Sequence, residues 1–191
     1  RLCAYQNRRY ARRYQRLVEA SRNAETTKTP GQTGFTEAVV RHAYKVMAYK
    51  DEYEVARLHR SKEFHNAVHE QFGDGSKVTY KLHPPSMRRL GLDQKIGLGR
   101  SGDVAFAVLR RMKFLRGTPL DLFGNTTHRK MERALVGEYQ EMIERMLADL
   151  RTETYDKALE VAELPDMIRG YEGVKEANVE KFREAAQGLI G

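Results

Sequence analysis

The chain has 191 residues, of which 40% are hydrophobic and 31% are charged, and it carries a formal net charge of +8. This is the profile of a globular domain with a packed core and a heavily charged surface, and no apolar run approaches the roughly 18 residues that a membrane span needs. The single cysteine, Cys3, excludes an internal disulfide and a four-thiolate metal or iron–sulfur site built from this chain alone.

Apolar residues recur with the 3.6-residue period of a helix along most of the chain. The clearest stripe is formed by Met131, Leu135, Tyr139, Met142 and Met146, which step by four, four, three and four residues. This pattern predicts helices over 2–24, 35–49, 61–72, 103–115, 126–152, 154–164 and 174–189. The segment 47–59 continues the second helix or follows it after a short break.

One segment changes period. Val78, Tyr80 and Leu82 alternate with polar residues, which is typical of a strand, and Pro84-Pro85 ends the pattern. A lone strand needs a partner, which we expect within 90–98, whereas the rest of 86–102 is glycine-rich and irregular. The predicted fold class is mainly α, a helical bundle with a small β-hairpin or edge-strand element around 77–98.

The charges are unevenly spread along the chain. Residues 1–22 hold seven Arg and one Glu, residues 81–116 hold nine bases and two acids, and residues 132–184 hold fourteen acids and eight bases. Such asymmetry can mark a nucleic-acid surface. We favour the simpler interpretation, that oppositely charged segments meet in the fold or face neighbouring domains, because no nucleic-acid-binding motif is present.

Three short motifs suggest ligand sites but lack the required context. Gly97, Gly99 and Gly102 spell G-x-G-x-x-G, but no convincing strand precedes them and no second parallel strand follows. The Gly-Asp-Gly at 73–75 is a turn signal without a suitably spaced Asn for a thiamine-diphosphate magnesium site. His65 and His69 could share a metal on one helix face, yet the only further ligands near them in sequence are His59 and His83. From the residues alone we therefore predict no catalytic, cofactor-binding or metal-binding residue in this chain.

The segment "VMAYKDEYEVARL", 46–58, resembles the C-terminal domain of the fused bacterial indolepyruvate ferredoxin oxidoreductases, a family of 2-oxoacid:ferredoxin oxidoreductases. Further blocks follow in the family's order and extend the resemblance to nearly the whole chain. They are "YQNRRYARRYQRLV" at 5–18, "LHPP" at 82–85, "LRGTPLDLFG" at 115–124, "ERALVGEYQ" at 132–140 and "ELPDMIRGYEGVKEAN" at 163–178.

The resemblance implies a parent enzyme that oxidatively decarboxylates an aryl-2-oxoacid to an acyl-coenzyme A while it reduces ferredoxin. It implies thiamine diphosphate, Mg²⁺ and 4Fe-4S clusters, all of them bound by other domains of the parent. This chain is then a single C-terminal accessory domain of a longer cytoplasmic protein. Within it we expect a helix that enters the domain (1–25), a linker (26–34) and a main body (35–191). The first residues, Arg1, Leu2 and Cys3, show no targeting pattern, low cysteine use fits a reducing cytoplasm, and we expect no membrane partner.

The charged and aromatic run at 50–53 has two interpretations. It can be a solvated helix face with an ion pair between Lys50 and Glu54, four residues apart. Alternatively it contacts another domain or another part of this one, because buried charges must be paired. The residues of this predicted contact are Lys50, Asp51, Glu52 and Tyr53, with Lys175, Glu176 and Asn178 as the counterpart.

The basic residues suggest a further contact. Ferredoxins are usually acidic, and complementary charge speeds the encounter of electron-transfer partners. An acidic partner could be steered by the 88–116 region and by the first-helix patch of Arg8, Arg9, Arg12, Arg13 and Arg16. The alternative function is a stand-alone basic binding module for an acidic protein or nucleic acid.

Overall fold

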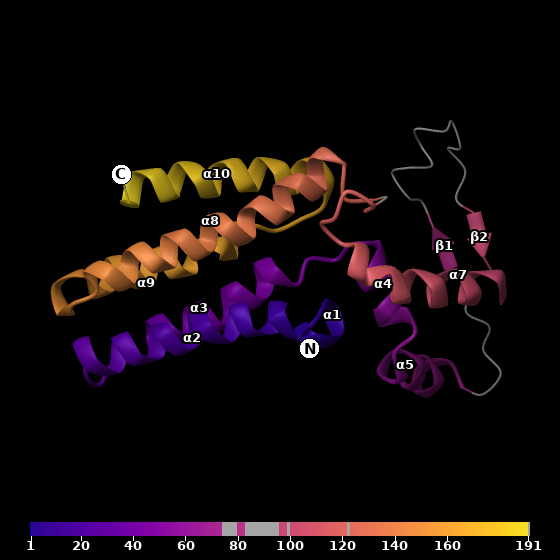
Figure 1. Cartoon of the computed structure of the whole chain (residues 1–191), viewed down its shortest axis with the longest axis horizontal. Helices are drawn as coiled ribbons and strands as arrows, with labels where there is room; N and C mark the ends of the chain where they lie inside the picture. The colour runs from indigo at the N-terminus through magenta and orange to yellow at the C-terminus, as the bar shows by residue number, and fades with distance from the viewer. Residues whose placement is uncertain (74–79, 83–95, 99, 122, 191) are drawn as a thin grey trace. The chain divides into compact units, whose positions relative to one another are not determined.

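The computed structural model describes residues 1–73, 80–82, 96–98, 100–121 and 123–190 (Figure 1). The chain divides into two compact units. The first unit contains Arg1, Cys3–Gln6 and Lys50–Asn125, and the second contains Leu2, Asn7–Tyr49 and Thr126–Gly191. The basic segment from Asn7 onward and the acidic C-terminal half fall in the same unit. The mainly α class is confirmed.

The second unit is a bundle of long helices. Its elements are α2 (Arg8–Lys28), α3 (Gly34–Met47), α8 (Thr127–Asp149), η2 (Thr152–Thr154), α9 (Tyr155–Glu163), η3 (Leu164–Met167) and α10 (Glu172–Ile190). Helix α3 packs on α2, α8 and α9, and α10 packs on α8, α9 and η3 (Figure 1).

The core of this bundle follows the predicted stripes. Leu135, Tyr139, Met142 and Met146 of the predicted stripe are buried on α8. Each large apolar side chain contributes about 1.5–3 kcal/mol through its burial. The helix that was predicted over 126–152 is therefore held chiefly by packing of its apolar face.

The predicted helix over 2–24 is wrong at its start. The chain forms a short helix, α1 (Leu2–Tyr5), and a separate helix α2 that runs on to Lys28. Asn7 interrupts the two because its extended backbone and its side chain, which accepts a 2.8 Å hydrogen bond from the Tyr10 amide, form an N-cap. The predicted linker is correspondingly shorter, and Gly31 turns the chain with a φ of 89°.

The first unit is built from shorter elements. They are α4 (Glu52–His59), α5 (Lys62–Phe72), β1 (Tyr80–Leu82), β2 (Ile96–Leu98), α7 (Arg100–Arg111) and η1 (Met112–Leu115). Helix α4 packs along α7, where Ala56 and Phe106 form a small buried cluster with Leu109. Helix α4 is therefore separate from α3, which ends at Met47, so the alternative of a short break within the segment 47–59 is the correct one.

The two strands pair antiparallel, with Tyr80 opposite Leu98 and Leu82 opposite Ile96. The partner strand predicted within 90–98 is confirmed, and the start predicted for β1 at 78 lies outside the described residues. The glycine motif begins inside β2, at Gly97, and α7 begins at Arg100, whereas residues 91–95 of the preceding segment lie outside the described residues. The pairing is antiparallel, however, whereas the dinucleotide fingerprint needs a parallel βαβ unit.

Candidate functional site

The polar centre of the first unit is a buried ion pair between Asp51 and Arg116. Their side chains are 4% and 3% exposed, and Arg116 Nη2 donates to Asp51 Oδ1 at 2.8 Å while Nε donates to Oδ2. Asp51 Oδ1 also accepts the Glu54 amide at 2.8 Å and so caps the start of α4. One carboxylate therefore begins a helix and neutralises a buried guanidinium.

Arg116 is enclosed by further partners within the same unit. Its Nη1 donates to the Tyr5 carbonyl oxygen at 2.7 Å, and its guanidinium carbon lies 3.8 Å from the centroid of the Tyr5 ring. A fork of donors with bidentate, carbonyl and ring contacts is a role that lysine cannot fill. Arg116 was counted among the steering bases of 88–116, and that interpretation is wrong because its charge is buried and paired.

A second buried contact lies beside this pair. Tyr53 Oη donates to Asp121 Oδ1 at 3.0 Å, and burial, together with this carboxylate, raises the pKa of Tyr53. Asp121 also accepts the amides of Gly117 at 2.8 Å and Gly124 at 3.0 Å, which shapes the 116–124 loop around one side chain. The blocks "VMAYKDEYEVARL" and "LRGTPLDLFG" are thus joined twice by buried polar contacts.

These contacts show where the predicted residues 50–53 lie. Asp51 and Tyr53 point into the first unit, Glu52 is half-buried, and Lys50 is exposed. Glu54 bonds to Arg57 at 2.6 and 2.7 Å instead of pairing with Lys50 as the solvated-face interpretation expected. The charged run is therefore largely paired inside its own unit, and Lys50 is its outward-facing member.

The predicted counterpart residues are engaged within the second unit. Lys175 Nζ lies 2.5 Å from the buried carboxylate of Glu132, which Arg129 also binds at 2.5 Å. Asn178 donates to the Arg169 carbonyl oxygen at 3.0 Å. Glu176 lies 3.5 Å from His128. The blocks at 132–140 and 163–178 are thereby joined by an ion pair, as the first two blocks are.

The predicted arginine patch lies on α2. Arg8, Arg9, Arg12, Arg13 and Arg16 are all exposed, and Arg13 donates to Gln140 on α8. The patch is accessible on the second unit.

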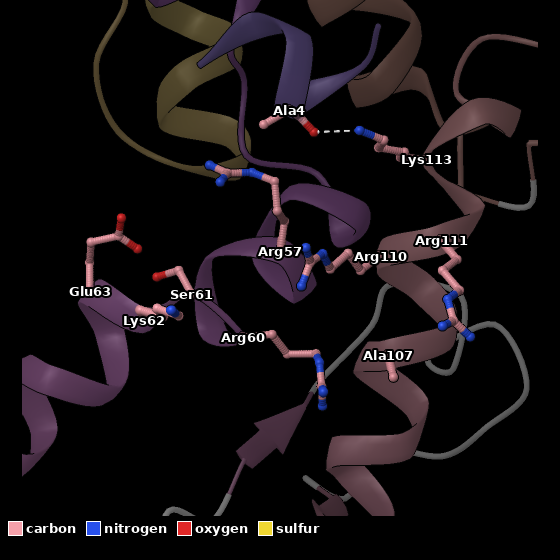
Figure 2. A pocket seen from close by; sticks show the side chains of 10 residues that line it. All are labelled: Ala4, Arg57, Arg60, Ser61, Lys62, Glu63, Ala107, Arg110, Arg111 and Lys113. Carbon is pink, nitrogen blue, oxygen red and sulfur yellow. Dashed lines mark hydrogen bonds between the residues drawn. The ribbon is translucent and has the colours of Figure 1, made fainter.

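The first unit also holds a cleft of about 970 Å³ that sequence reasoning did not identify. Figure 2 shows its lining side chains, which come from Ala4 of α1, the end of α4, the start of α5, and α7 with η1. Six of the ten lining residues are basic and one, Glu63, is acidic: Arg57, Arg60, Lys62, Arg110, Arg111 and Lys113. The bases at 57–62 and 110–113 were visible as two short clusters, but only the packing of α4 on α7 brings them together.

The remaining motifs add no site among the described residues. His65 and His69 are exposed, and the described part of the chain contains no group of three or more His, Cys, Asp or Glu placed to hold a metal. Gly73 ends α5 with a φ of 77°, as a turn glycine does, and the rest of that motif lies outside the described residues. Gly99 is likewise outside them. No helix within the described ranges is long and apolar enough to cross a membrane.

Fold and site define a mainly helical chain of two units, each held by a buried ion-pair network, with a basic cleft in the first. Residues 1–188 match the family described as "Family of unknown function (DUF6537)", and the chain belongs to that family. Neither curated proteins nor solved structures gave a significant match.

Proposed function

We propose that this chain is an accessory, structural domain of a thiamine-diphosphate-dependent aryl-2-oxoacid:ferredoxin oxidoreductase of the indolepyruvate type. The observation that carries the proposal concerns the blocks of the resemblance. The block at 46–58 binds the block at 115–124 through Asp51–Arg116, and the block at 132–140 binds the block at 163–178 through Glu132–Lys175. Charged residues that pair with one another inside the fold stabilise it, and stabilising the structure is the role of an accessory domain.

The donor set of this chain does not fit the cofactors of the proposed parent. One cysteine cannot supply four thiolates to a 4Fe-4S cluster, and the described residues contain no group of three or more His, Cys, Asp or Glu placed to hold a metal ion. In the proposed enzyme these groups belong to other domains. Oxidation of indolepyruvate, transfer of the acyl group to coenzyme A and reduction of ferredoxin take place there, and we derive no chemical step from residues of this chain.

The proposal is tested on the natural protein that carries this chain. It should reduce ferredoxin when indolepyruvate and coenzyme A are both supplied, and omission of either should stop the reaction. Protein that contains thiamine diphosphate and iron but reduces no ferredoxin with any aryl-2-oxoacid would contradict the proposal. Protein that contains neither cofactor would favour the alternative, a stand-alone basic module for an acidic protein or nucleic acid.

Docking to the catalytic domains or subunits is tested at Lys50. Because Lys50 is exposed while Asp51 is internally paired, Lys50→Glu changes the surface without breaking the buried network. Assembly of the parent enzyme should weaken, whereas reversal of the exposed Lys181 on α10 serves as the matched control. If both variants assemble as well as the wild-type protein does, Lys50 is not part of the contact.

Ferredoxin steering is a second, separable part of the proposal. Neutralising Arg8, Arg9, Arg12 and Arg16 should lower the rate of ferredoxin reduction at low ionic strength and flatten its salt dependence, because surface steering is screened within about 10 Å at 0.1 M salt. If the variant and wild type respond alike to ionic strength, the patch only contributes solubility.

A further inference from the structure

The cleft of the first unit concentrates positive charge that the fold does not use. Arg57 binds Glu54, and Lys113 Nζ donates to the Ala4 carbonyl oxygen at 2.7 Å (Figure 2). In contrast Lys62, Arg110 and Arg111 have no carboxylate partner among the described residues. This excess of cations in one concavity costs stability through repulsion, so a ligand that relieves it is favoured.

The pKa of Lys113 reflects this excess of positive charge. Burial lowers the pKa of Lys113, and the nearby charges of Arg116, Arg110 and Arg57 lower it further. Arg116 is neutralised by Asp51, but Arg110 has no such partner among the described residues. The local potential of the cleft is therefore positive before any ligand binds.

The shape of the cleft favours a small molecule over a flat macromolecular surface. Its volume of about 970 Å³ lies at the upper end of the roughly 300–1,000 Å³ that ligand pockets occupy. Four separate segments of the unit line it, so a ligand in the cleft would contact several of them at once. None of its ten lining residues is aromatic, so no base-stacking platform is present and recognition falls on the charged part of the ligand.

The residue types indicate phosphate. Four of the six bases are arginines, whose planar donors bind phosphate oxygens in pairs. Helix α5 begins at Lys62 on the cleft wall, and Ser61 caps it by accepting the Phe64 amide at 3.1 Å, so the positive end of an eleven-residue helix adds to the side-chain charge. Glu63 is the single opposing charge of the lining.

We propose that this cleft binds a phosphate-bearing small molecule with at least two phosphate groups, through Arg110, Arg111 and Lys62. The inference does not depend on the proposed oxidoreductase role, because it uses only the contacts of the first unit. A free diphosphate and the diphosphate of a nucleotide share the recognised chemistry, and the experiment separates them.

The test is isothermal titration of the full chain with sodium pyrophosphate, ADP and sodium sulfate in parallel. Pyrophosphate and ADP should bind with similar affinity, since no aromatic side chain reads the base, and sulfate should bind at least about tenfold more weakly because it offers fewer charge-assisted hydrogen bonds. ADP binding far tighter than pyrophosphate binding would identify the nucleotide as the source of the phosphate and a base contact beyond the named residues. Absence of measurable binding by both pyrophosphate and ADP would overturn the proposal.

Matched variants locate the site. Arg110→Gln with Arg111→Gln should weaken pyrophosphate binding by about tenfold or more, because two charge-assisted bonds are lost. The control, Arg22→Gln on α2 with Arg145→Gln on α8, removes the same charge from exposed positions of the second unit and should change the affinity by less than about twofold.

Glu63→Gln supplies an opposite change, since it should tighten pyrophosphate binding by roughly twofold as repulsion is removed. If the cleft double variant and the control double variant weaken pyrophosphate binding equally, the attraction comes from the overall charge of the protein and the proposed site is refuted. The proposal is also refuted if a single-stranded oligonucleotide binds, if the double variant Arg110→Gln with Arg111→Gln weakens that binding, and if pyrophosphate cannot displace the oligonucleotide. The cleft would then bind nucleic acid and not a small molecule. Circular dichroism verifies that the variants, all at exposed positions, remain folded.

Discussion

Replacement of Asp51 by Asn isolates the value of the buried ion pair. Asn caps a helix about as well as Asp, so the amide of Glu54 keeps its acceptor and only the negative charge beside Arg116 is lost. The guanidinium is then buried without a counter-charge, and breaking a buried pair in this way costs about 3–5 kcal/mol. That is a large share of the roughly 5–15 kcal/mol that stabilises a typical domain.

Urea unfolding followed by circular dichroism measures the loss. With a slope of about 2 kcal/mol per molar urea, Asp51→Asn should lower the midpoint by roughly 1.5–2.5 M. Glu70→Gln, an exposed carboxylate of the same unit, should change stability by less than about 0.5 kcal/mol. The double variant Asp51→Asn with Arg116→Met should recover part of the loss, since it removes both charges. A single variant as stable as the Glu70 control would refute the argument.

Three further outcomes follow from the second unit. Burial lowers the pKa of His42, so the unfolded chain binds a proton near pH 6.5 more readily than the folded chain does. The stability of the protein should therefore fall as the pH drops below about 6.5. Urea midpoints at about pH 7.5 and 5.5 should differ less in His42→Gln than in wild type. Buried Glu25 accepts the Phe35 amide at 2.9 Å with Oε1 and the Thr36 amide at 3.0 Å with Oε2, and Gln offers only one oxygen, so Glu25→Gln should cost about 1–3 kcal/mol in urea unfolding, and an unchanged midpoint would contradict this role. Glu132→Gln leaves Lys175 without its buried carboxylate and should cost about 3 kcal/mol by the same measurement, whereas a loss below about 1 kcal/mol would place the pair with exposed ones.

The helices could be predicted because their apolar spacing is local information. The stripe from Leu135 to Met146 predicts both the existence and the buried face of α8, and the structure confirms both. The break between α1 and α2 was missed because the apolar period continues across it, whereas the competing signal is a single capping residue, Asn7. At this position the apolar period predicts a continuous helix and the capping residue predicts a new helix start, and the structure follows the capping residue.

The pairing of charges could not be predicted in the same way. Asp51 and Arg116 are 65 positions apart, and a basic run gives no sign of which member turns inward. The steering region 88–116 therefore included both Arg110, which is exposed and lines the cleft, and Arg116, which is buried. Tertiary packing decides these contacts, and the sequence pattern of each segment alone carries too little information about its partner.

The central claim is that the internally paired charges of the resemblance blocks, Asp51 with Arg116 and Glu132 with Lys175, hold the fold and do not take part in chemistry. It is tested most directly in the natural protein that carries this chain, by comparing Asp51→Asn with wild type for ferredoxin reduction per folded, cofactor-loaded molecule at a temperature where both are folded. The account predicts a lowered unfolding midpoint with turnover unchanged within about twofold, because the pair acts only through stability. A variant that keeps wild-type stability but loses turnover would contradict it.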